Sequence, residues 1–356
     1  MAAEAQPLLN TVRRSIPKSP WAVALKSQRN DGRYLPQNIA HRGYKAEFPE
    51  NTMAGFKAAV GVGAHAIETD LHLSSDGVIV LTHDGSLKRT YGVEKKVNEC
   101  TWEYLSTLKT VREPHESMPR LLDLLEWLAE PELEKTWVVL DIKMDDSAED
   151  LLSALVHVLA QVPASVPWDK RIVLGCWNAT FLETARRLLP AYPLALISFS
   201  TLYARHFLPV TNVGFNMLRQ SILGYLGGSF LRAAHQRDRL VLSWTVNDEA
   251  AMRWCLDRNL QRRQAGVAAT GGARVLDGVI TDDPKLFREV CERWEDEQDG
   301  KAAPPPKAGL ASRVRSSMGF AFFQVMIAMY HFLGVYVHGH MNSIKDRAAL
   351  EASEKK

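Results

Sequence analysis

Short apolar runs alternate with segments of helical periodicity along most of the chain, and this alternation restricts the fold more than any other feature. It is typical of repeated βα units around a parallel sheet. We predict strands at 38–41, 65–71, 78–83, 137–142, 171–176, 194–199, 212–215, 240–245 and 278–281. That is one strand more than a (β/α)8 barrel holds. Only the turn Ser75–Gly77 joins the second and third strands, so we expect one strand of this hairpin to depart from the barrel repeat.

The predicted helices each show one apolar stripe. Met53, Phe56 and Val60 form the stripe of the helix at 52–60, and Asp283 with Pro284 opens the last helix of the barrel. We interpret these stripes as packing surfaces. A chain of 356 residues that is 46% hydrophobic can bury a large core, and a (β/α)8 barrel takes about 250 residues. We therefore predict an α/β TIM barrel over residues 38–296, preceded by an irregular lead-in over residues 1–37.

Three carboxylates are candidates for a metal site. Glu68 and Asp70 lie two apart in one apolar run, so they project from the same face of a strand. Asp141 ends a later run, and Lys143 shares its face. Oxygen ligands of this kind favour one Mg²⁺ or Ca²⁺ ion over zinc. The alternative is structural ion pairing, because buried carboxylates are costly without a partner.

Two histidines are candidates for proton transfer. His41 and His83 both follow predicted strands, and charged residues at the carboxyl ends of parallel strands converge at the mouth of a barrel. Arg42 precedes Gly43, which allows close backbone approach, and its guanidinium suits phosphate oxygens. A single histidine is more often structural than catalytic, and we give that interpretation to His65, His72, His115, His157, His206 and His235.

These residues form an ordered series of motifs: His41-Arg-Gly43, Glu50-Asn-Thr52, Glu68-Thr-Asp70, and Asp76-Gly-x-x-Val-x-x-His83-Asp84. The series resembles the glycerophosphodiester phosphodiesterase family, which are metal-dependent (β/α)8 barrels, and the likeness extends over about residues 38–290. Ser243–Asn247 and Asp277–Asp282 resemble its last two strands.

The resemblance implies a role for each motif residue. It implies that His41 and His83 are the general acid and base, that Arg42 and Lys143 contact phosphate, and that Glu68, Asp70 and Asp141 bind the metal. Glu50 and Trp244 are further candidates. The family commonly has glutamate where Asp141 stands. The shorter aspartate side chain departs from this pattern and would extend less far towards the metal.

Net charge and cysteine usage exclude some classes of protein. The net charge is +2, which argues against nucleic acid as a partner. The four cysteines show no close-spaced metal or redox pattern, so we expect a reducing compartment. Arg13 and Arg14 are not followed by a long apolar run, and we expect no secretory signal peptide.

The carboxyl-terminal segment predicts contact with a membrane. An acidic and proline-rich linker at 297–317 precedes 318–337, which contains no charged residue and is followed by a polar tail at 338–356. Twenty residues of helix span about 30 Å, the thickness of a bilayer core. We predict a membrane-anchor helix. A helix docked on the barrel and an interfacial helix are the alternatives, because Gln324 and His331 interrupt the apolar run.

The barrel with an apolar tail is similar to the fungal phosphatidylglycerol phospholipases C of this family. The resemblance implies hydrolysis of phosphatidylglycerol to diacylglycerol and glycerol phosphate. Two alternatives stay open: hydrolysis of soluble glycerophosphodiesters to glycerol 3-phosphate and an alcohol, and a non-catalytic anchored barrel that binds lipid or a partner. The apolar stretches 207–211 and 217–230 fit either contact with lipid or internal packing.

For location we expect an intracellular endomembrane, mitochondrial or lipid-droplet surface, with the barrel facing the cytosol. The sequence gives no oligomeric state.

Overall fold

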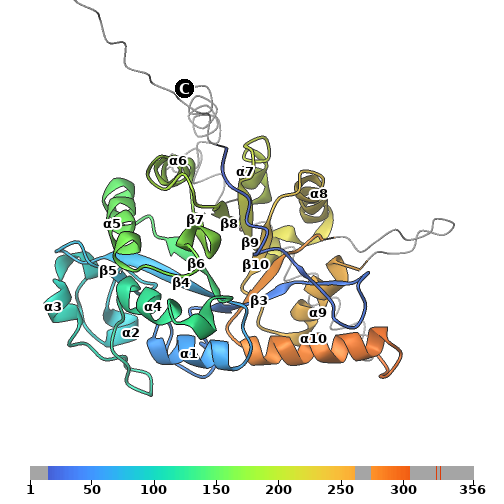
Figure 1. Ribbon diagram of the computed structural model, residues 1–356, viewed down its shortest axis with the longest axis horizontal. Helices are drawn as coiled ribbons and strands as arrows, with labels where there is room; N and C mark the ends of the chain where they lie inside the picture. The colour runs from blue at the N-terminus through green and yellow to red at the C-terminus, as the bar shows by residue number, and fades with distance from the viewer. Residues whose placement is uncertain (1–14, 261–273, 305–325, 327–328, 330–356) are drawn as a thin grey trace, which may run out of the picture.

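A parallel β-barrel surrounded by helices forms the centre of the molecule (Figure 1). The structure is a computed structural model that describes residues 15–260 and 274–304, together with Met326 and Met329. The parallel strands, in order around the barrel, are β3 (Gln37–His41), β4 (Ala66–Leu73), β6 (Trp137–Ile142), β7 (Ile172–Cys176), β8 (Leu194–Ser198), β9 (Gly214–Leu218), β10 (Val241–Trp244) and β11 (Gly278–Thr281). β3 pairs with both β11 and β4, which closes the barrel.

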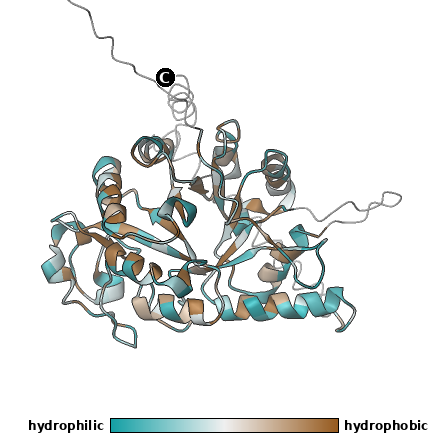
Figure 2. Ribbon diagram, viewed as in Figure 1, coloured by the Kyte–Doolittle hydropathy of each residue, from teal (hydrophilic) through white to brown (hydrophobic). Residues whose placement is uncertain are grey.

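Helices cover the outside of this barrel. They are α1 (Met53–Gly61), α4 (Leu121–Leu128), α5 (Ala148–Gln161), α6 (Ala179–Leu188), α7 (Thr201–Arg205), α8 (Gly224–His235), α9 (Glu249–Arg258) and α10 (Pro284–Gln298). Thr52 caps α1 by accepting from the Gly55 N–H, and Asp283 caps α10 by accepting from the Leu286 N–H. α10 is hydrophilic over much of its length in Figure 2 because only one face packs on the barrel.

The prediction of a (β/α)8 barrel is confirmed, and the extra strand is the expected exception. β5 (Ile79–Leu81) pairs antiparallel with β4 and lies outside the parallel set. The segment after β5 forms two short helices, α2 (Lys88–Tyr91) and α3 (Trp102–Leu105), and the 3-10 turn η1 (Val97–Glu99). The connection from β4 to β6 is therefore an insertion rather than a single helix.

One predicted strand is displaced. The strand expected at 212–215 begins at Gly214 and runs to Leu218. Asn212 has a φ of 62°, a left-handed conformation that a strand does not contain, so the chain is still turning at that residue. The apolar residues Met217 and Leu218 then continue the strand to the site.

Residues that precede β3 close the bottom of the barrel. The strands β1 (Leu25–Lys26) and β2 (Tyr34–Leu35) pair with each other. Trp21 packs edge-on against Trp137 with ring centroids 5.3 Å apart. Ala22 joins the apolar cluster inside the barrel, with Ile39, Ala66, Trp137, Val139, Val173, Ala195, Leu242 and Ile280. The amino-terminal ends of the strands are thus sealed, and the opposite end is left for chemistry.

The predicted membrane-anchor helix at 318–337 lies outside the described residues, apart from Met326 and Met329, which are helical and exposed. In the part of the chain that the structure describes, no helix combines the length and the apolar character needed to cross a bilayer.

Candidate active site

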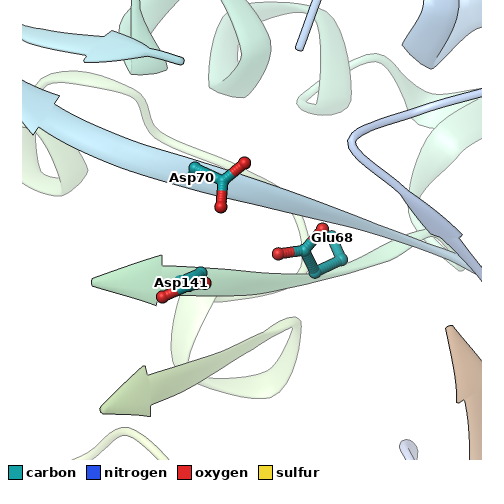
Figure 3. Close-up of side chains that lie close together, drawn as sticks. All are labelled: Glu68, Asp70 and Asp141. Carbon is teal, nitrogen blue, oxygen red and sulfur yellow. The ribbon is translucent and has the colours of Figure 1, made fainter. Parts of the chain in front are cut away.

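Three buried carboxylates meet at the carboxyl ends of β4 and β6. Glu68 and Asp70 project from the same side of β4, and Asp141 lies opposite Asp70 in the parallel register of β6. A carboxylate oxygen of each residue lies within 4.8 Å of one from each of the others. Figure 3 shows Glu68 and Asp70 on β4 and Asp141 close by on the neighbouring strand β6. Asp141 therefore reaches the cluster despite its short side chain.

Two cations partly balance these carboxylates. The Lys143 ammonium lies 2.7 Å from Asp70 Oδ1 and 2.7 Å from Asp141 Oδ2, and Arg42 Nε lies 3.3 Å from Asp70 Oδ2. Burial raises the pKa of Asp70, but Lys143 and Arg42 outweigh burial and bring that pKa below its ordinary value. Burial lowers the pKa of Lys143, yet Asp70 and Asp141 raise it by more.

Arg42 and Lys143 compensate the charge of Glu68 only in part. Its pKa is raised well above the usual value by burial and then by the charges of Asp70 and Asp141. A divalent cation among the three residues would stabilise the ionised form of Glu68. The donor set contains only carboxylate oxygens, which suits Mg²⁺ or Ca²⁺. The residues present therefore fit a hard divalent cation.

His41 ends β3 and is held by the carboxylate of Asp282, which directly follows β11. Its Nδ1–H donates to Asp282 Oδ1 at 2.5 Å, and its Nε2 lies 4.0 Å from Glu68 Oε2. Asn247 Nδ2 donates to the other oxygen of Asp282 at 2.8 Å. Burial lowers the pKa of His41, and Asp282 offsets part of that effect. The imidazole is thus oriented with Nε2 free for proton transfer, as in other histidine–carboxylate pairs.

His83 follows β5 and faces the same site from the other side of β4. Its Nδ1–H donates to Asp84 Oδ1 at 2.7 Å, and its pKa is lowered by burial, with Asp70 acting in the opposite direction. His72 supports the loop, because its Nε2–H donates to the His83 carbonyl oxygen at 3.2 Å and its Nδ1 contacts Asp146 Oδ2 at 3.0 Å. His72 is therefore structural, and it fixes the backbone that carries His83.

Arg42 lies in a left-handed turn directly after β3. Its φ is 57° and that of Gly43 is 85°. A Cβ atom on Gly43 would come within 2.8 Å of the Gly55 carbonyl carbon, so only glycine fits there. The turn directs the Arg42 guanidinium to Glu50 Oε1 at 3.1 Å and to Asp70. The arginine predicted to contact phosphate is thus positioned over the carboxylates.

Glu50 lies outside the acidic cluster and pairs with basic side chains. Arg89 donates to both of its oxygens, at 3.0 and 2.6 Å, and Lys45 lies 3.9 Å away. Arg89 Nε also donates to Asp84 at 2.6 Å. Glu50 therefore joins the Arg42 turn to the insertion after β5.

A cavity of about 150 Å³ lies among these groups at the mouth of the barrel. It is lined by His41, Arg42, Glu68, His83, Asp141, Lys143, Trp177, Ile197, Asn216, Trp244 and Ile280. All the predicted site residues except Glu50 and Asp70 line it, and Glu50 and Asp70 contact Arg42 directly. The predicted candidates are thus brought together at one end of the barrel.

Several residues of the site were not predicted, and three of them hydrogen-bond to His41 or to the acidic cluster. Asp282 holds His41, Trp177 Nε1 donates to Asp141 Oδ1 at 2.8 Å, and Asn51 Nδ2 donates to Asp70 Oδ2 at 2.8 Å. Asp282 and Trp177 directly follow predicted strands, so the rule that found His41 could have found them. Asn51 lies within the Glu-Asn-Thr motif, but its spacing gives no signal for a bond to Asp70.

A mouth that holds two histidines, an arginine and an oxygen-only acidic triad defines a hydrolase of phosphate esters. The model of the glycerophosphoryl diester phosphodiesterase family matches residues 41–286, which is well over half of the chain. The chain belongs to this family and is a phosphoric diester hydrolase. The family uses a divalent metal, and Glu68, Asp70 and Asp141 could bind one.

Two of three similar proteins match most of the barrel, and the third matches a shorter stretch. A glycerophosphodiester phosphodiesterase of Caldanaerobacter subterraneus is 26% identical over 263 residues, 72% of this chain and 97% of the relative. Lysophospholipase D GDPD1 of Rattus norvegicus is 43% identical over 79 residues, 22% of this chain and 25% of the relative. An Oleispira antarctica phosphodiesterase structure, in complex with the product sn-glycerol-3-phosphate, has a TM-score of 0.58, with 24% identity over 72% of this chain and 97% of that chain.

Proposed function

We propose that this chain uses Mg²⁺ or Ca²⁺ to hydrolyse phosphatidylglycerol to diacylglycerol and glycerol phosphate, as a phospholipase C does. The observation that carries the chemistry is the shared cavity, in which His41 and His83 face Arg42 and the carboxylates. Two histidines can supply a base and an acid to one phosphodiester at the same time. A bound cation would neutralise charge on the phosphoryl oxygens.

The glycerol head group makes an internal attack possible. One of its hydroxyls is adjacent to the phosphate ester, so one histidine can remove that proton while the oxygen attacks phosphorus. The other histidine protonates the departing diacylglycerol oxygen as the ester bond breaks. Water then opens the cyclic phosphate, with the two histidines in exchanged roles, and glycerol phosphate leaves. The Arg42 turn holds a guanidinium over the carboxylates, where it can orient the phosphate.

The size of the cavity supports partial enclosure of the substrate. Its volume of about 150 Å³ is below the ~300–1,000 Å³ of sites that enclose a whole drug-sized ligand. A phosphorylated head group can enter, while the second alcohol extends towards the mouth. Such a site accepts a lipid whose acyl chains stay outside.

The same feature supports a second candidate, the hydrolysis of soluble glycerophosphodiesters to glycerol 3-phosphate and an alcohol. The Caldanaerobacter relative is named as a glycerophosphodiester phosphodiesterase, and the Oleispira enzyme holds sn-glycerol-3-phosphate as its product. Under both proposals the attacked bond and the site residues are the same. Under the lipid proposal we also place the protein at an intracellular membrane, through residues 318–337.

Product analysis separates the two. The full chain and a His41→Ala control are incubated with phosphatidylglycerol vesicles and with glycerophosphodiesters, in Mg²⁺ or Ca²⁺, and products are measured by mass spectrometry. Diacylglycerol that forms only with intact His41 supports the phospholipase C proposal. Glycerol phosphate formed from the soluble diesters alone rejects it in favour of the second candidate.

A further inference from the structure

Three exposed apolar side chains lie at the catalytic end of the barrel. Leu202 is 48% exposed in the first turn of α7, and Tyr225 and Leu226 are 84% and 54% exposed in the first turn of α8. α7 and α8 pack against each other, and they follow β8 and β9, which contribute Ile197 and Asn216 to the cavity. α6, α7 and α8 lie together along the upper edge of Figure 1. We call Leu202, Tyr225 and Leu226 the α7–α8 rim.

Buried aromatic side chains and a tight turn support the α7–α8 rim. Tyr203, Phe207 and Phe230, from the same two segments, are fully buried beneath it. Gly227 lies so close to the Ile222 backbone that a Cβ atom would come within 2.1 Å of the Ile222 carbonyl carbon. The turn into α8 is therefore tightly packed, and its exposed residues have no vacant core into which they could fold. Apolar side chains held outward in this way indicate a binding surface.

An aromatic surface joins the rim to the catalytic carboxylates. The Trp177 ring lies 6.3 Å from that of Phe199 and 5.8 Å from that of Trp244, between ring centroids. Trp177 also donates its indole N–H to Asp141. Phe199 follows β8 and precedes Leu202 by three residues. Aromatic contacts thus extend from the Asp141 side of the cavity to Phe199, which lies three residues before Leu202 of the rim.

The segment that forms the rim carries basic side chains and no acidic ones. Residues 199–226, from Phe199 to Leu226, contain Arg205 and Arg219 and no aspartate or glutamate. Arg205 is fastened to the rim itself, because its guanidinium donates to the Leu226 carbonyl oxygen at 3.3 Å. Apolar side chains beside basic ones suit the surface of an anionic bilayer.

Two other exposed apolar residues, Met144 and Leu25, have different surroundings. Met144 is followed by Asp145, whose side chain is 68% exposed. Leu25 lies at the opposite end of the barrel, in a recess lined by Lys26, Arg29, Arg288, Glu292 and Glu295. Leu25 therefore serves as the control for position, because it is 42% exposed but lies away from the catalytic mouth.

We propose that the α7–α8 rim seats the catalytic mouth on an anionic phospholipid bilayer. The apolar arm of the diester then reaches the cavity along Phe199 and Trp177 without leaving an apolar surface. The path of the substrate rests on the proposed phospholipase C function, whereas the seating of the barrel does not. The rim acts in addition to any anchor at 318–337, since it fixes the orientation of the mouth.

A depth measurement tests the seating independently of hydrolysis. In the full-length His41→Ala chain, which leaves the lipid intact, Tyr225→Cys is labelled with an environment-sensitive NBD group, and Leu25→Cys is labelled as the control. The parent chain is treated in the same way to correct for labelling of the native cysteines. Vesicles of equimolar phosphatidylglycerol and phosphatidylcholine carry brominated acyl chains as quenchers.

We expect the label at 225 to be quenched in the anionic vesicles and the label at 25 to stay unquenched. Equal quenching at both positions, or at neither, would overturn the proposal, because a tail alone could then account for any binding. Equal quenching at 225 in vesicles of phosphatidylcholine alone would overturn the requirement for anionic lipid.

Kinetics test the path of the substrate. The combined variant Leu202→Ser, Tyr225→Ser and Leu226→Ser should turn over phosphatidylglycerol in vesicles at least tenfold more slowly than Leu25→Ser, while both keep the wild-type rate on a soluble glycerophosphodiester. Equal rates on vesicles would reject the path. A wild-type chain with no activity on phosphatidylglycerol would reject the proposed lipid substrate, and the quenching result would still decide the seating.

Discussion

His41 depends on Asp282 for its orientation, and this dependence predicts the effect of a single atom change. In Asp282→Asn the acceptor of the His41 Nδ1–H is altered, so the imidazole can take the other tautomer. By comparison with other histidine–carboxylate pairs, we expect kcat to fall by about 10²–10⁴. Asp282 raises the pKa of His41, so its loss moves the limb of the pH–rate profile that belongs to His41 to lower pH.

Steady-state kinetics over a range of pH check this expectation. Asp283→Asn is the matched control, because Asp283 is the neighbouring aspartate and its side chain caps α10 by accepting from the Leu286 N–H, which an asparagine can also do. An Asp282→Asn enzyme with unchanged kcat would show that Nδ1 needs no carboxylate.

The place of Asp141 in the acidic cluster leads us to predict that activity depends on a divalent metal. Removal of divalent ions with a chelator should abolish activity, and addition of Mg²⁺ or Ca²⁺ should restore it. Asp141→Asn removes one of the three charges and should raise the cation concentration for half-maximal activity by about 10- to 100-fold or more. Titration of activity with each ion measures this shift, and Asp145→Asn, at an exposed position nearby, should leave it unchanged. Full activity of the chelated wild type would contradict a metal role for the cluster.

At the residue scale, the sequence predicted charged groups that end apolar strands better than it predicted their partners. Glu68, Asp70 and Asp141 follow from alternation along strands, and the register of β4 with β6 brings them together. The bonds from Asn51 to Asp70 and from Trp177 to Asp141 depend on how loops fold back over the barrel. Spacing along the chain carries no information on such contacts.

At the scale of elements, the insertion after β5 is tied to the site by charge. Arg89, in α2, donates to Asp84 and to Glu50. Burial raises the pKa of Asp84, but bonds from Arg89 and His83 outweigh it and lower this pKa to about 2, below the ordinary value of 3.8. The ionised form of Asp84 therefore stabilises the fold above pH 3.8, and this stabilisation is lost as the pH falls through about 2.

We expect Asp84→Asn to lower the free energy of unfolding at pH 6 by about 1 kcal/mol, a value reduced for the partial exposure of the group to solvent. The difference between wild type and variant should shrink as the pH approaches 2. Denaturant unfolding at pH 6 and pH 3 measures it. A difference that grows on acidification would contradict the assignment.

Strands and helices were predictable where the sequence shows a clear apolar run or a single hydrophobic periodicity. The strands at 137–142 and 278–281 and the start of α10 were predicted at or near their observed bounds, because apolar runs and a cap mark them. β9 was placed too early, because the apolar Val213 precedes the strand while Asn212 still occupies a left-handed turn. The antiparallel pairing of β5 was expected from its short turn. The course of the insertion after it was not, because its short helices are held by long-range contacts.

For the molecule as a whole, the closed end of the barrel contributes to stability, and the open end carries the residues of the active site. Arg171, at the start of β7, is buried at the closed end, where its guanidinium donates to the backbone carbonyl oxygens of Leu128, Leu133 and Thr136. Arg171→Ala would leave these carbonyls without donors. We expect it to lower the free energy of unfolding by about 3 kcal/mol, with kcat per folded molecule unchanged within about twofold.

Chemical denaturation and active-site titration together check this separation. Lys170→Ala is the control, because Lys170 is exposed and pairs with the adjacent Asp169. A loss of kcat in Arg171→Ala at full stability would show that the closed end takes part in catalysis.

Closure of the barrel was predictable from the number of strands, but the seal at its base was not. The irregular look of residues 15–36 gave no sign that Trp21 and Ala22 enter the interior. The small and aromatic residues of this segment show no hydrophobic periodicity. Their positions are set by the space that they fill below the strands.

The bond from Trp177 to Asp141 gives this protein a built-in optical reporter. The fluorescence of an indole whose N–H donates to a carboxylate depends on the charge and position of that carboxylate. When a cation binds beside Asp141, the emission of Trp177 should change, and Trp177→Phe should remove that change. Occupancy of the catalytic centre could then be followed by stopped-flow spectroscopy in the native chain, without substrate and without an added dye.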